Sequence, residues 1–287
     1  MFIFVALILL ALALSGLTYS LAGWYSLWYM FWTIPLFAGI YYLALFASFI
    51  IALYLFSLLI AKDKDRIYPP SRPTMWIISE TAFLILRFLR VSPKISGLGK
   101  LPPRGTPIVI VHNHLSMFDE FVLLTCLPRP LVFISKPSNL RIPIAGAYMR
   151  KAGYLPIVQD DLVNGAQIIA KGQDLLRKGV NVCIAPEGTR NKDFPEKMML
   201  PFHPGSFRLA TEVKAHIVLF AIQNTNNIAS RFPGKTKVYC DCVGVITPEE
   251  YENLSSKELA IHCQNLIFQR LENKKARSYH LKKKKED

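Results

Sequence analysis

Two short polar clusters contain the residue types and spacings best suited to catalysis. The first is Asn-His-Leu-Ser-Met-Phe-Asp at residues 113–119, which places His114 close to Asp119 along the chain. A histidine whose imidazole is held by a carboxylate can take a proton from an alcohol, so this pair is a candidate general base with its orienting acid. Because Ser116 and Asp119 also have the Ser-x-x-Asp spacing of a capping box, the alternative is that Asp119 only closes the first turn of a helix.

The second cluster is Pro-Glu-Gly-Thr-Arg at residues 186–190. Gly188 allows a backbone to approach a ligand closely, and Arg190 can bind a phosphate through two N–H groups. Glu187 can accept a hydrogen bond from a hydroxyl or orient Arg190. The alternative is a polar turn after a buried strand. Both clusters follow β-branched runs, and in a parallel sheet they would share the edge where strands end and ligands bind.

The elements that position these clusters follow from hydrophobic periodicity. Strands are expected at residues 108–112, 131–135, 154–158, 180–185, 217–222 and 237–245, and helices at 162–178 and 205–214. This alternation predicts an α/β domain at residues 67–287, with a mostly parallel sheet and flanking helices. An amphipathic helix at about residues 74–91 precedes the sheet and is interpreted either as a membrane-surface helix or as an ordinary packing helix. A last helix is expected to begin near Ser255 or Ser256, with Glu258 placed for capping, before a basic C-terminal tail.

The N-terminal part of the chain differs in composition from the rest. Residues 1–61 contain no Asp, Glu, Lys, Arg or His. Apolar runs at 1–19 and 24–60 are long enough to cross a bilayer, and Pro35 is a possible break in the second. The first run lacks the basic start of a signal peptide, so residues 1–66 are predicted to be a membrane anchor with two transmembrane helices. Lys62, Lys64 and Arg66 follow it, and the positive-inside tendency places the catalytic domain on the cytoplasmic face.

The net charge of +14 therefore comes entirely from residues 62–287. A basic domain attracts anions, and with a hydrophobic anchor these are expected to be lipid headgroups, the phosphates of coenzyme A or an acidic carrier protein. No nucleic-acid recognition motif is present. The five cysteines have no spacing typical of a disulfide framework, and no further cysteine or histidine stands at zinc spacing, so no metal is expected.

Together the two clusters resemble the motifs of the glycerolipid acyltransferase family, typified by 1-acylglycerol-3-phosphate acyltransferase. Asn113-His114-x-Ser116-x-x-Asp119 is similar to its first motif and residues 186–190 to its third, and the resemblance extends over about residues 95–222. It implies a membrane-seated α/β enzyme without metal or other cofactor. The implied reaction moves an acyl group from acyl-CoA or acyl carrier protein to the 2-hydroxyl of 1-acylglycerol-3-phosphate, making phosphatidic acid for phospholipid synthesis. His114 and Asp119 would be catalytic, and the acceptor would be bound by Glu187, Gly188, Thr189 and Arg190.

Two departures from the family pattern bear on the acceptor. The second motif resembles residues 153–159, with Gln159 where a phosphate-binding Arg is expected, and the fourth resembles residues 218–222 without its prolines. Another cation would then replace the missing Arg, and Lys136 is preferred because it follows an expected strand. The other cations considered are Arg150, Lys151 and Arg208.

Other functions remain as alternatives at this point. They are an acyltransferase for a different lysophospholipid or a glycolipid, a membrane-bound acyl thioesterase, and a lipid-binding scaffold without activity. The absence of a Gly-x-Ser-x-Gly nucleophile elbow lowers the odds of a serine hydrolase. The five remaining histidines, interpreted as structural or surface residues, are His112, His203, His216, His262 and His280.

Overall fold

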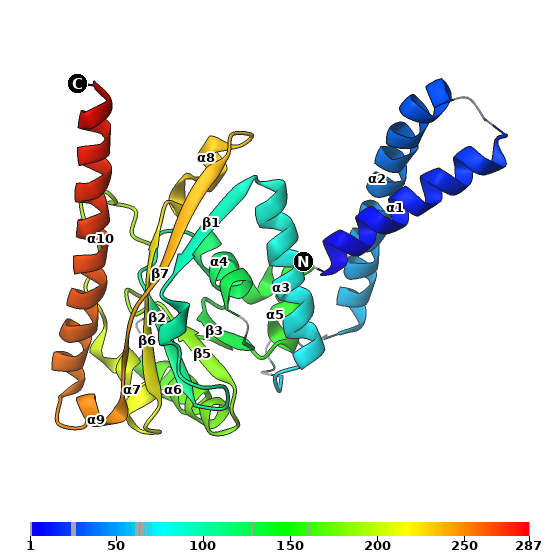
Figure 1. The fold of residues 1–287 in the computed structure, drawn as a ribbon. Coiled ribbons are helices and arrows are strands. Elements are labelled where there is room, and N and C mark those ends of the chain that lie inside the picture. The colour runs from blue at the N-terminus through cyan, green and yellow to red at the C-terminus, as the bar shows by residue number, and fades with distance from the viewer. Residues whose placement is uncertain are drawn as a thin grey trace.

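The computed structural model describes residues 2–23, 27–60, 63, 66, 68–127, 129–159 and 161–286. Two N-terminal helices, α1 (Phe2–Leu21) and α2 (Leu27–Leu59), form a hairpin that projects from an α/β domain (Figure 1). Lys62 and Lys64, on which the predicted orientation partly depends, lie outside the described residues. A hydrogen bond between the hydroxyls of Thr18 and Tyr41, at 2.7 Å, links the two helices.

The hairpin has the composition of a membrane segment. Among the described helices, the stretch Trp28–Leu59 is the one long and apolar enough to cross a membrane, and the shorter Val5–Leu21 is also apolar. Pro35 does not end α2, contrary to one of the expectations for the second apolar run. Leu9, Leu43 and Trp28 are more than half exposed. An apolar surface of this extent suggests association with a membrane.

A seven-stranded sheet forms the centre of the domain, in the order β1-β7-β6-β2-β5-β3-β4. Its neighbouring strands are parallel except for β6 and β7, which are antiparallel. The strands are β1 (Val91–Ser96), β2 (Ile108–His112), β3 (Leu131–Ser135), β4 (Leu155–Pro156), β5 (Asn181–Ile184), β6 (His216–Gln223) and β7 (Thr236–Ile246). The predicted α/β class and mostly parallel sheet are confirmed. β4 is shorter than expected, and β1 was not predicted.

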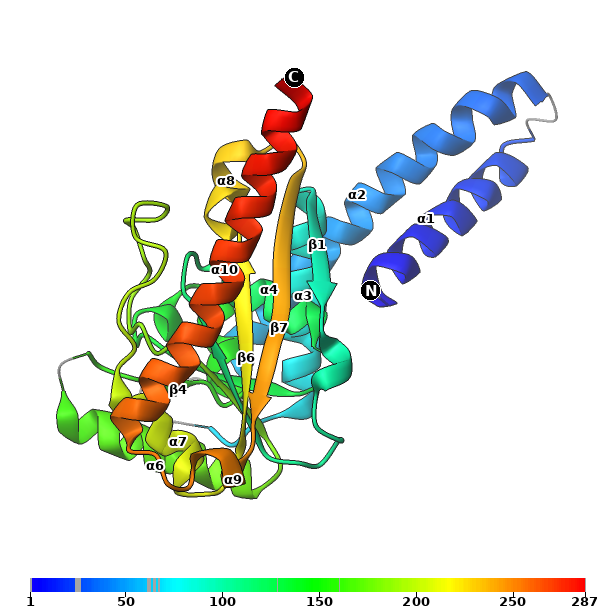
Figure 2. The ribbon, with the colours of Figure 1, turned by 60° about the vertical axis from the view of Figure 1, so that its left-hand side comes forward.

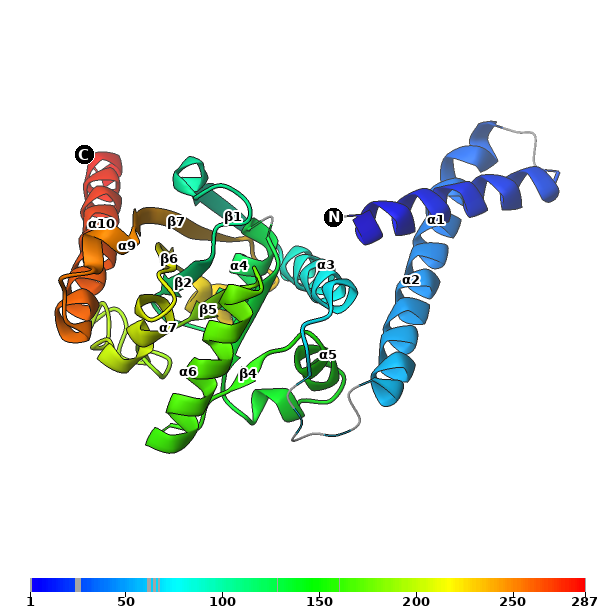
Figure 3. The same cartoon turned by 90° about the horizontal axis from the view of Figure 1, so that it is seen from below.

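The helices cover both faces of the sheet (Figure 3). The α-helices of the domain are α3 (Arg72–Phe88), α4 (Phe118–Cys126), α5 (Ala145–Lys151), α6 (Leu162–Arg177), α7 (Arg208–Thr211), α8 (Ile228–Arg231), α9 (Pro248–Tyr251) and α10 (Ser256–Glu286). Cys126 of α4 lies against Cys240 of β7, whereas the next residue, Asp241, accepts a hydrogen bond from Arg270 of α10. Because successive strand residues point to opposite faces, α4 and α10 lie on opposite sides of the sheet.

Two helix predictions need correction. The helix expected at residues 205–214 is only a 3-10 turn, Pro204–Phe207, followed by the single turn of α7, and the helix expected at 74–91 already ends at Phe88. The last helix begins as predicted, because the Ser255 amide donates to Glu258 at 2.8 Å. It then crosses the sheet diagonally and continues to Glu286 (Figure 2).

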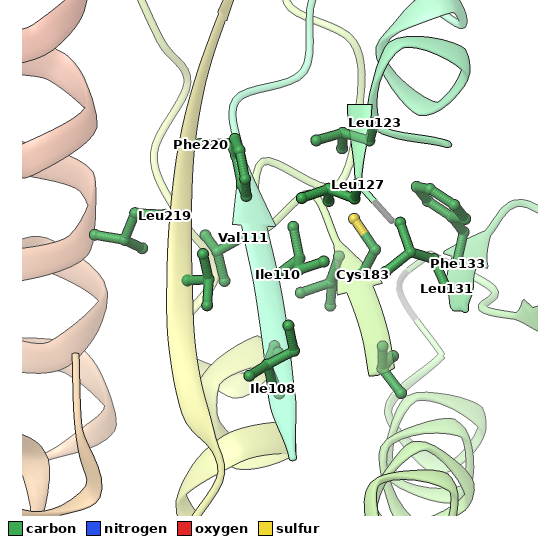
Figure 4. Close-up of a cluster of buried hydrophobic side chains, with 14 of the residues drawn as sticks. Ile108, Ile110, Val111, Leu123, Leu127, Leu131, Phe133, Cys183, Leu219 and Phe220 are labelled. Carbon is green, nitrogen blue, oxygen red and sulfur yellow. The ribbon is translucent and has the colours of Figure 1, made fainter. Parts of the chain in front are cut away.

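The core fixes β2 in the middle of the sheet (Figure 4). All five β2 residues are buried, and Ile108 and Ile110 are fully inaccessible to solvent. Phe133 of β3 and Phe220 of β6 pack in the same core. Complete burial of such a side chain stabilises the fold by about 1.5–3 kcal/mol. The residues that follow β2 therefore leave the sheet from a rigid position.

Candidate functional site

The loop after β2 is attached to the neighbouring strand before it reaches His114. The Asn113 side-chain nitrogen Nδ2 donates to the Ile222 carbonyl at 2.9 Å, and the Ile222 backbone N–H donates to the Asn113 side-chain oxygen Oδ1 at 2.7 Å. Asn113 is completely buried. This pair of hydrogen bonds continues the β2–β6 pairing by one residue, so His114 is held at the carboxyl edge of the sheet, where ligand sites of α/β folds lie.

His114 and Asp119 form the predicted pair. The distance from His114 Nδ1 to Asp119 Oδ2 is 2.9 Å, and the side chain of Asp119 is fully buried while that of His114 is 19% exposed. Asp119 Oδ2 also accepts from the backbone N–H groups of Leu115 and Ser116. Both interpretations of this carboxylate are therefore correct, since it closes the turn before α4 and contacts the imidazole. As a carboxylate only accepts, the proton lies on Nδ1 and Nε2 is left as a base.

Thr225 is a third member of this arrangement that the sequence did not indicate. Its hydroxyl donates to Asp119 Oδ1, and the side chains of both residues are fully buried. Thr225 is the first residue of the 3-10 turn after β6. The residue before it, Asn224, has a left-handed conformation with φ 70°. No local pattern marks a threonine this far from Asp119 in the chain. The contact arises only because β2 and β6 are neighbours in the sheet.

Glu187 supports the His114 loop from the other side. Its Oε1 accepts from the His114 N–H at 2.8 Å, its Oε2 accepts from the Leu200 N–H at 2.9 Å, and the residue is 3% exposed. The Asn191 N–H in addition donates to the His114 carbonyl at 2.8 Å. Because both carboxylate oxygens are engaged by backbone groups, the geometry favours a positioning role for Glu187 over the predicted contact with the acceptor.

Replacing Glu187 by Gln is expected to reduce the pH dependence of stability near neutral pH. Burial raises the pKa of Glu187 from about 4.5 to about 7. Between these values the folded protein holds a proton that the unfolded chain has released. The free energy of unfolding therefore falls as the pH rises through this interval, by up to about 3 kcal/mol. Unfolding midpoints of the detergent-solubilised protein, measured across this interval, should show a shallower slope in Glu187→Gln than in the wild type. The slope that remains is assigned to Glu120, whose pKa burial also raises to about 7.

The matched control is Glu196→Gln, which changes an exposed glutamate in the same loop region. It should keep the wild-type slope. A Glu187→Gln protein with an undiminished slope would assign the pH dependence to another buried group.

The remainder of the second cluster faces solvent beside Gln159. Gly188 has φ 68°, and a Cβ there would lie 3.2 Å from the His203 ring. The Gln159 amide donates to the Gly188 carbonyl. Thr189 and Arg190 are exposed. Gln159 therefore lies next to the third motif, and His203, interpreted from the sequence as structural or surface, borders the same loop.

The four cations considered as substitutes for the missing Arg differ in their surroundings. Arg150 is buried and donates to the Leu140 carbonyl, Lys151 lies over the ring of Tyr68, and Arg208 pairs with Glu212. Lys136 directly follows β3 and is exposed. Within the described part of the chain, its ammonium group has no hydrogen bond or ion pair. Of these four cations, Lys136 is thus the one that lies exposed at a strand end and could bind a phosphate without giving up another contact among the described residues.

The imidazole of His112 is close to His114, with ring centroids 6.0 Å apart, but it is buried. Its Nδ1 lies 2.8 Å from the Asn113 carbonyl. Burial lowers the pKa of His112 to about 4, so this ring stays neutral near pH 7. A buried neutral histidine fits the structural role predicted for it.

In sequence, the chain is similar to known acyltransferases. Residues 92–223 match the family model Acyltransferase. The chain is 34% identical over 134 residues to a chloroplastic 1-acyl-sn-glycerol-3-phosphate acyltransferase of Brassica napus, covering 47% of this chain and 38% of that relative. It is 26% identical over 206 residues to the 1-acyl-sn-glycerol-3-phosphate acyltransferase of Saccharomyces cerevisiae, covering 71% and 67% of the two chains. The chain thus spans less than half the length of the Brassica relative.

In fold, the chain resembles the crystal structure of the 1-acyl-sn-glycerophosphate acyltransferase PlsC from Thermotoga maritima. The TM-score is 0.60 at 19% identity, over 81% of this chain and 89% of that one. At this identity the likeness concerns the fold. The residues that match the family model, 92–223, contain the His114–Asp119 pair and Glu187. Residues 92–223 thus match the acyltransferase family model in sequence, and the chain has a fold similar to that of PlsC.

Proposed function

We propose that this protein transfers a fatty acyl group from an acyl thioester to the 2-hydroxyl of 1-acylglycerol-3-phosphate. The 2.9 Å contact between His114 Nδ1 and buried Asp119, at the carboxyl edge of the sheet, is the observation that carries the proposal. The activity for which the Brassica and Saccharomyces relatives are named supports it. The product is phosphatidic acid, which places the reaction in phospholipid synthesis.

The proposed chemistry is direct transfer. His114 Nε2 takes the proton of the acceptor 2-hydroxyl as the hydroxyl oxygen attacks the thioester carbonyl, giving a tetrahedral oxyanion. The oxyanion then reforms the carbonyl, the carbon–sulfur bond breaks, and the proton passes from His114 to the departing thiolate. Asp119 stabilises the imidazolium formed in between. No covalent acyl-enzyme is needed, and neither is a bound metal.

Exposed groups at the same edge are assigned to the acceptor phosphate. Arg190 follows β5 and Lys136 follows β3, and these strands are neighbours that end on the same side of the sheet. Gly188 and Thr189 complete the loop, and its left-handed glycine allows the backbone to approach an anion. In the proposal, Lys136 supplies the positive charge that Gln159 lacks.

The proposal places the enzyme in a membrane with its domain on the cytoplasmic face. The apolar helices α1 and α2 are its anchor, and Arg66 follows them in the chain. Lysophospholipid acceptors reside in the bilayer, so an anchored domain is presented to its substrate. Acyl-CoA and acyl carrier protein are both anionic and both suit a basic domain as donors.

The deciding experiment is acyl transfer by the purified protein from a labelled acyl thioester, with and without lysophosphatidic acid and with neutral or zwitterionic lysolipids in parallel. Label is expected to move to lysophosphatidic acid. Transfer to another lysolipid or to a glycolipid would keep the chemistry and reassign the acceptor, which the Gln159 substitution makes the leading alternative. Release of thiol without a lipid product would identify a thioesterase instead.

Replacing Arg190 by Ala is expected to raise the KM for lysophosphatidic acid roughly ten- to a hundredfold. A charged hydrogen bond contributes about 1.5–3 kcal/mol. Among the residues that the structure describes, the exposed Arg190 guanidinium forms no hydrogen bond or ion pair that the replacement would disturb. The measurement is steady-state acyl transfer at saturating donor. Lys192→Ala, an exposed charge two residues further along, should leave this KM unchanged. Equal KM values for the wild type, Arg190→Ala and Lys192→Ala would show that Arg190 does not bind the acceptor.

A further inference from the structure

A basic cavity includes Asn224, the residue before Thr225, and takes no part in the proposed reaction. Its volume is about 370 Å³, and its lining residues are Asn224, Arg231, Lys235, Lys237 and Tyr239. The three cations are exposed. Within the described residues, none of them forms an ion pair with an acidic side chain. Three like charges lining one cavity repel each other, so the site is suited to an anion.

An exposed aromatic pair adjoins this basic cavity. Phe88, the last residue of α3, stacks on Phe232 with ring centroids 5.5 Å apart. The two residues are 67% and 42% exposed. Phe232 directly follows Arg231, so apolar rings and positive charges alternate on one surface. Such a combination is typical of protein segments that rest at the boundary between lipid headgroups and acyl chains.

Hydrogen bonds from side chains and from the backbone connect the aromatic pair to the cavity. The Arg90 guanidinium donates to the Pro233 carbonyl at 3.0 Å, and the Thr236 N–H donates to the Arg90 carbonyl at 3.2 Å. These contacts connect the corner between α3 and β1 to the segment between α8 and β7. The Asn224 amide donates to the Lys237 carbonyl at 3.1 Å and closes the other side of the cavity.

The cavity also has a defined position relative to the catalytic pair and the apolar hairpin. Asn224 lines the cavity and directly precedes Thr225, whose hydroxyl donates to Asp119. The cavity is therefore next to the 3-10 turn that supports the His114–Asp119 pair. α8 and the far ends of α1 and α2 lie toward the same end of the molecule in Figures 1 and 2. A membrane that receives the hairpin would therefore be on the side where the cavity lies.

From these observations we infer that Arg231, Lys235 and Lys237, together with the Phe88–Phe232 pair, form a docking surface for anionic phospholipid headgroups of the bilayer. The cavity receives a headgroup phosphate and the two rings rest at the headgroup level. The inference depends on membrane association of the chain, which the apolar hairpin supports, but not on the identity of the acyl acceptor. Each cation near an anionic leaflet favours docking about fivefold, so three favour it on the order of a hundredfold.

The test is hydrogen exchange of the full-length protein in lipid nanodiscs of phosphatidylcholine, alone or mixed with phosphatidylglycerol. The backbone amides of residues 228–239 are expected to exchange about tenfold more slowly in the mixed discs than in phosphatidylcholine discs. This factor is smaller than the roughly hundredfold preference for docking that three cations give. The variant with Arg231→Gln, Lys235→Gln and Lys237→Gln is expected to exchange equally fast in both kinds of disc. A third arm adds inorganic phosphate to the phosphatidylcholine discs.

The matched control carries Lys178→Gln, Lys214→Gln and Lys257→Gln, which remove the same charge from exposed positions before β5, before β6 and at the start of α10. It should keep the protection seen in the wild type. Three results would overturn the inference: no difference between discs in the wild type, equal loss of protection in both triple variants, or full protection by inorganic phosphate in phosphatidylcholine discs. The last result would identify a site for small anions instead of a membrane surface.

Discussion

The His114→Ala protein is expected to transfer acyl groups about 10²- to 10⁴-fold more slowly than the wild type, with little change in either KM. That range is the usual contribution of a positioned general base. The effect should fall on kcat because Nε2 is used only when the acceptor hydroxyl attacks. The measurement is steady-state transfer from an acyl thioester to the acceptor identified by the lysolipid panel.

Two controls separate chemistry from folding in this experiment. His203→Ala removes an exposed imidazole that borders Gly188 and should leave kcat within a few-fold of the wild type. Added imidazole should restore part of the activity of His114→Ala, because a small base can enter the space that the side chain vacated. A His114→Ala protein with near-normal turnover would exclude the proposed base.

The strands that the sequence predicted well are those whose pattern is local and unambiguous. β2 and β3 are β-branched runs buried in the centre of the sheet, and their observed bounds equal the predicted ones. β1 was missed because Val-Ser-Pro-Lys-Ile-Ser has no apolar run, and its short alternation contains Pro93, which argues against a strand. It is an edge strand whose single neighbour is β7, and at an edge a Pro is tolerated.

Contacts of the site between residues close together in the chain could be predicted from the sequence, and contacts between distant residues could not. His114 lies in the loop after β2 and Asp119 in the first turn of α4, only five residues further along the chain, so their spacing alone indicated the pair. The hydrogen bond from Thr225 to Asp119 and the support of the His114 loop by Glu187 depend on which strands are neighbours in the sheet. Spacing along the chain contains no such information. For the same reason the sequence did not indicate that the Glu187 oxygens accept from two backbone N–H groups, while its contact with the acceptor stays a prediction.

The Asp119→Asn protein is expected to lose kcat by up to about 10⁴-fold, as the same exchange does in Ser-His-Asp systems. An amide at this position can turn its NH2 group toward His114 Nδ1. The imidazole then carries its proton on Nε2 and can no longer take one from the acceptor. The buried amide also keeps only part of the four hydrogen bonds that the carboxylate accepts, from His114, Leu115, Ser116 and Thr225.

A graded series distinguishes this positioning role from a loss of structure. Thr225→Val keeps the side-chain shape and removes one hydrogen bond to Asp119, which should cost about 1–3 kcal/mol of stability and a smaller part of kcat than Asp119→Asn. If Asp119 acts by setting the imidazole tautomer, kcat will fall much further in Asp119→Asn than the difference in stability between the two variants accounts for, with the KM of the acceptor near that of the wild type. If instead kcat falls in proportion to stability across both variants, Asp119 only holds the turn before α4, and the base at His114 acts without it.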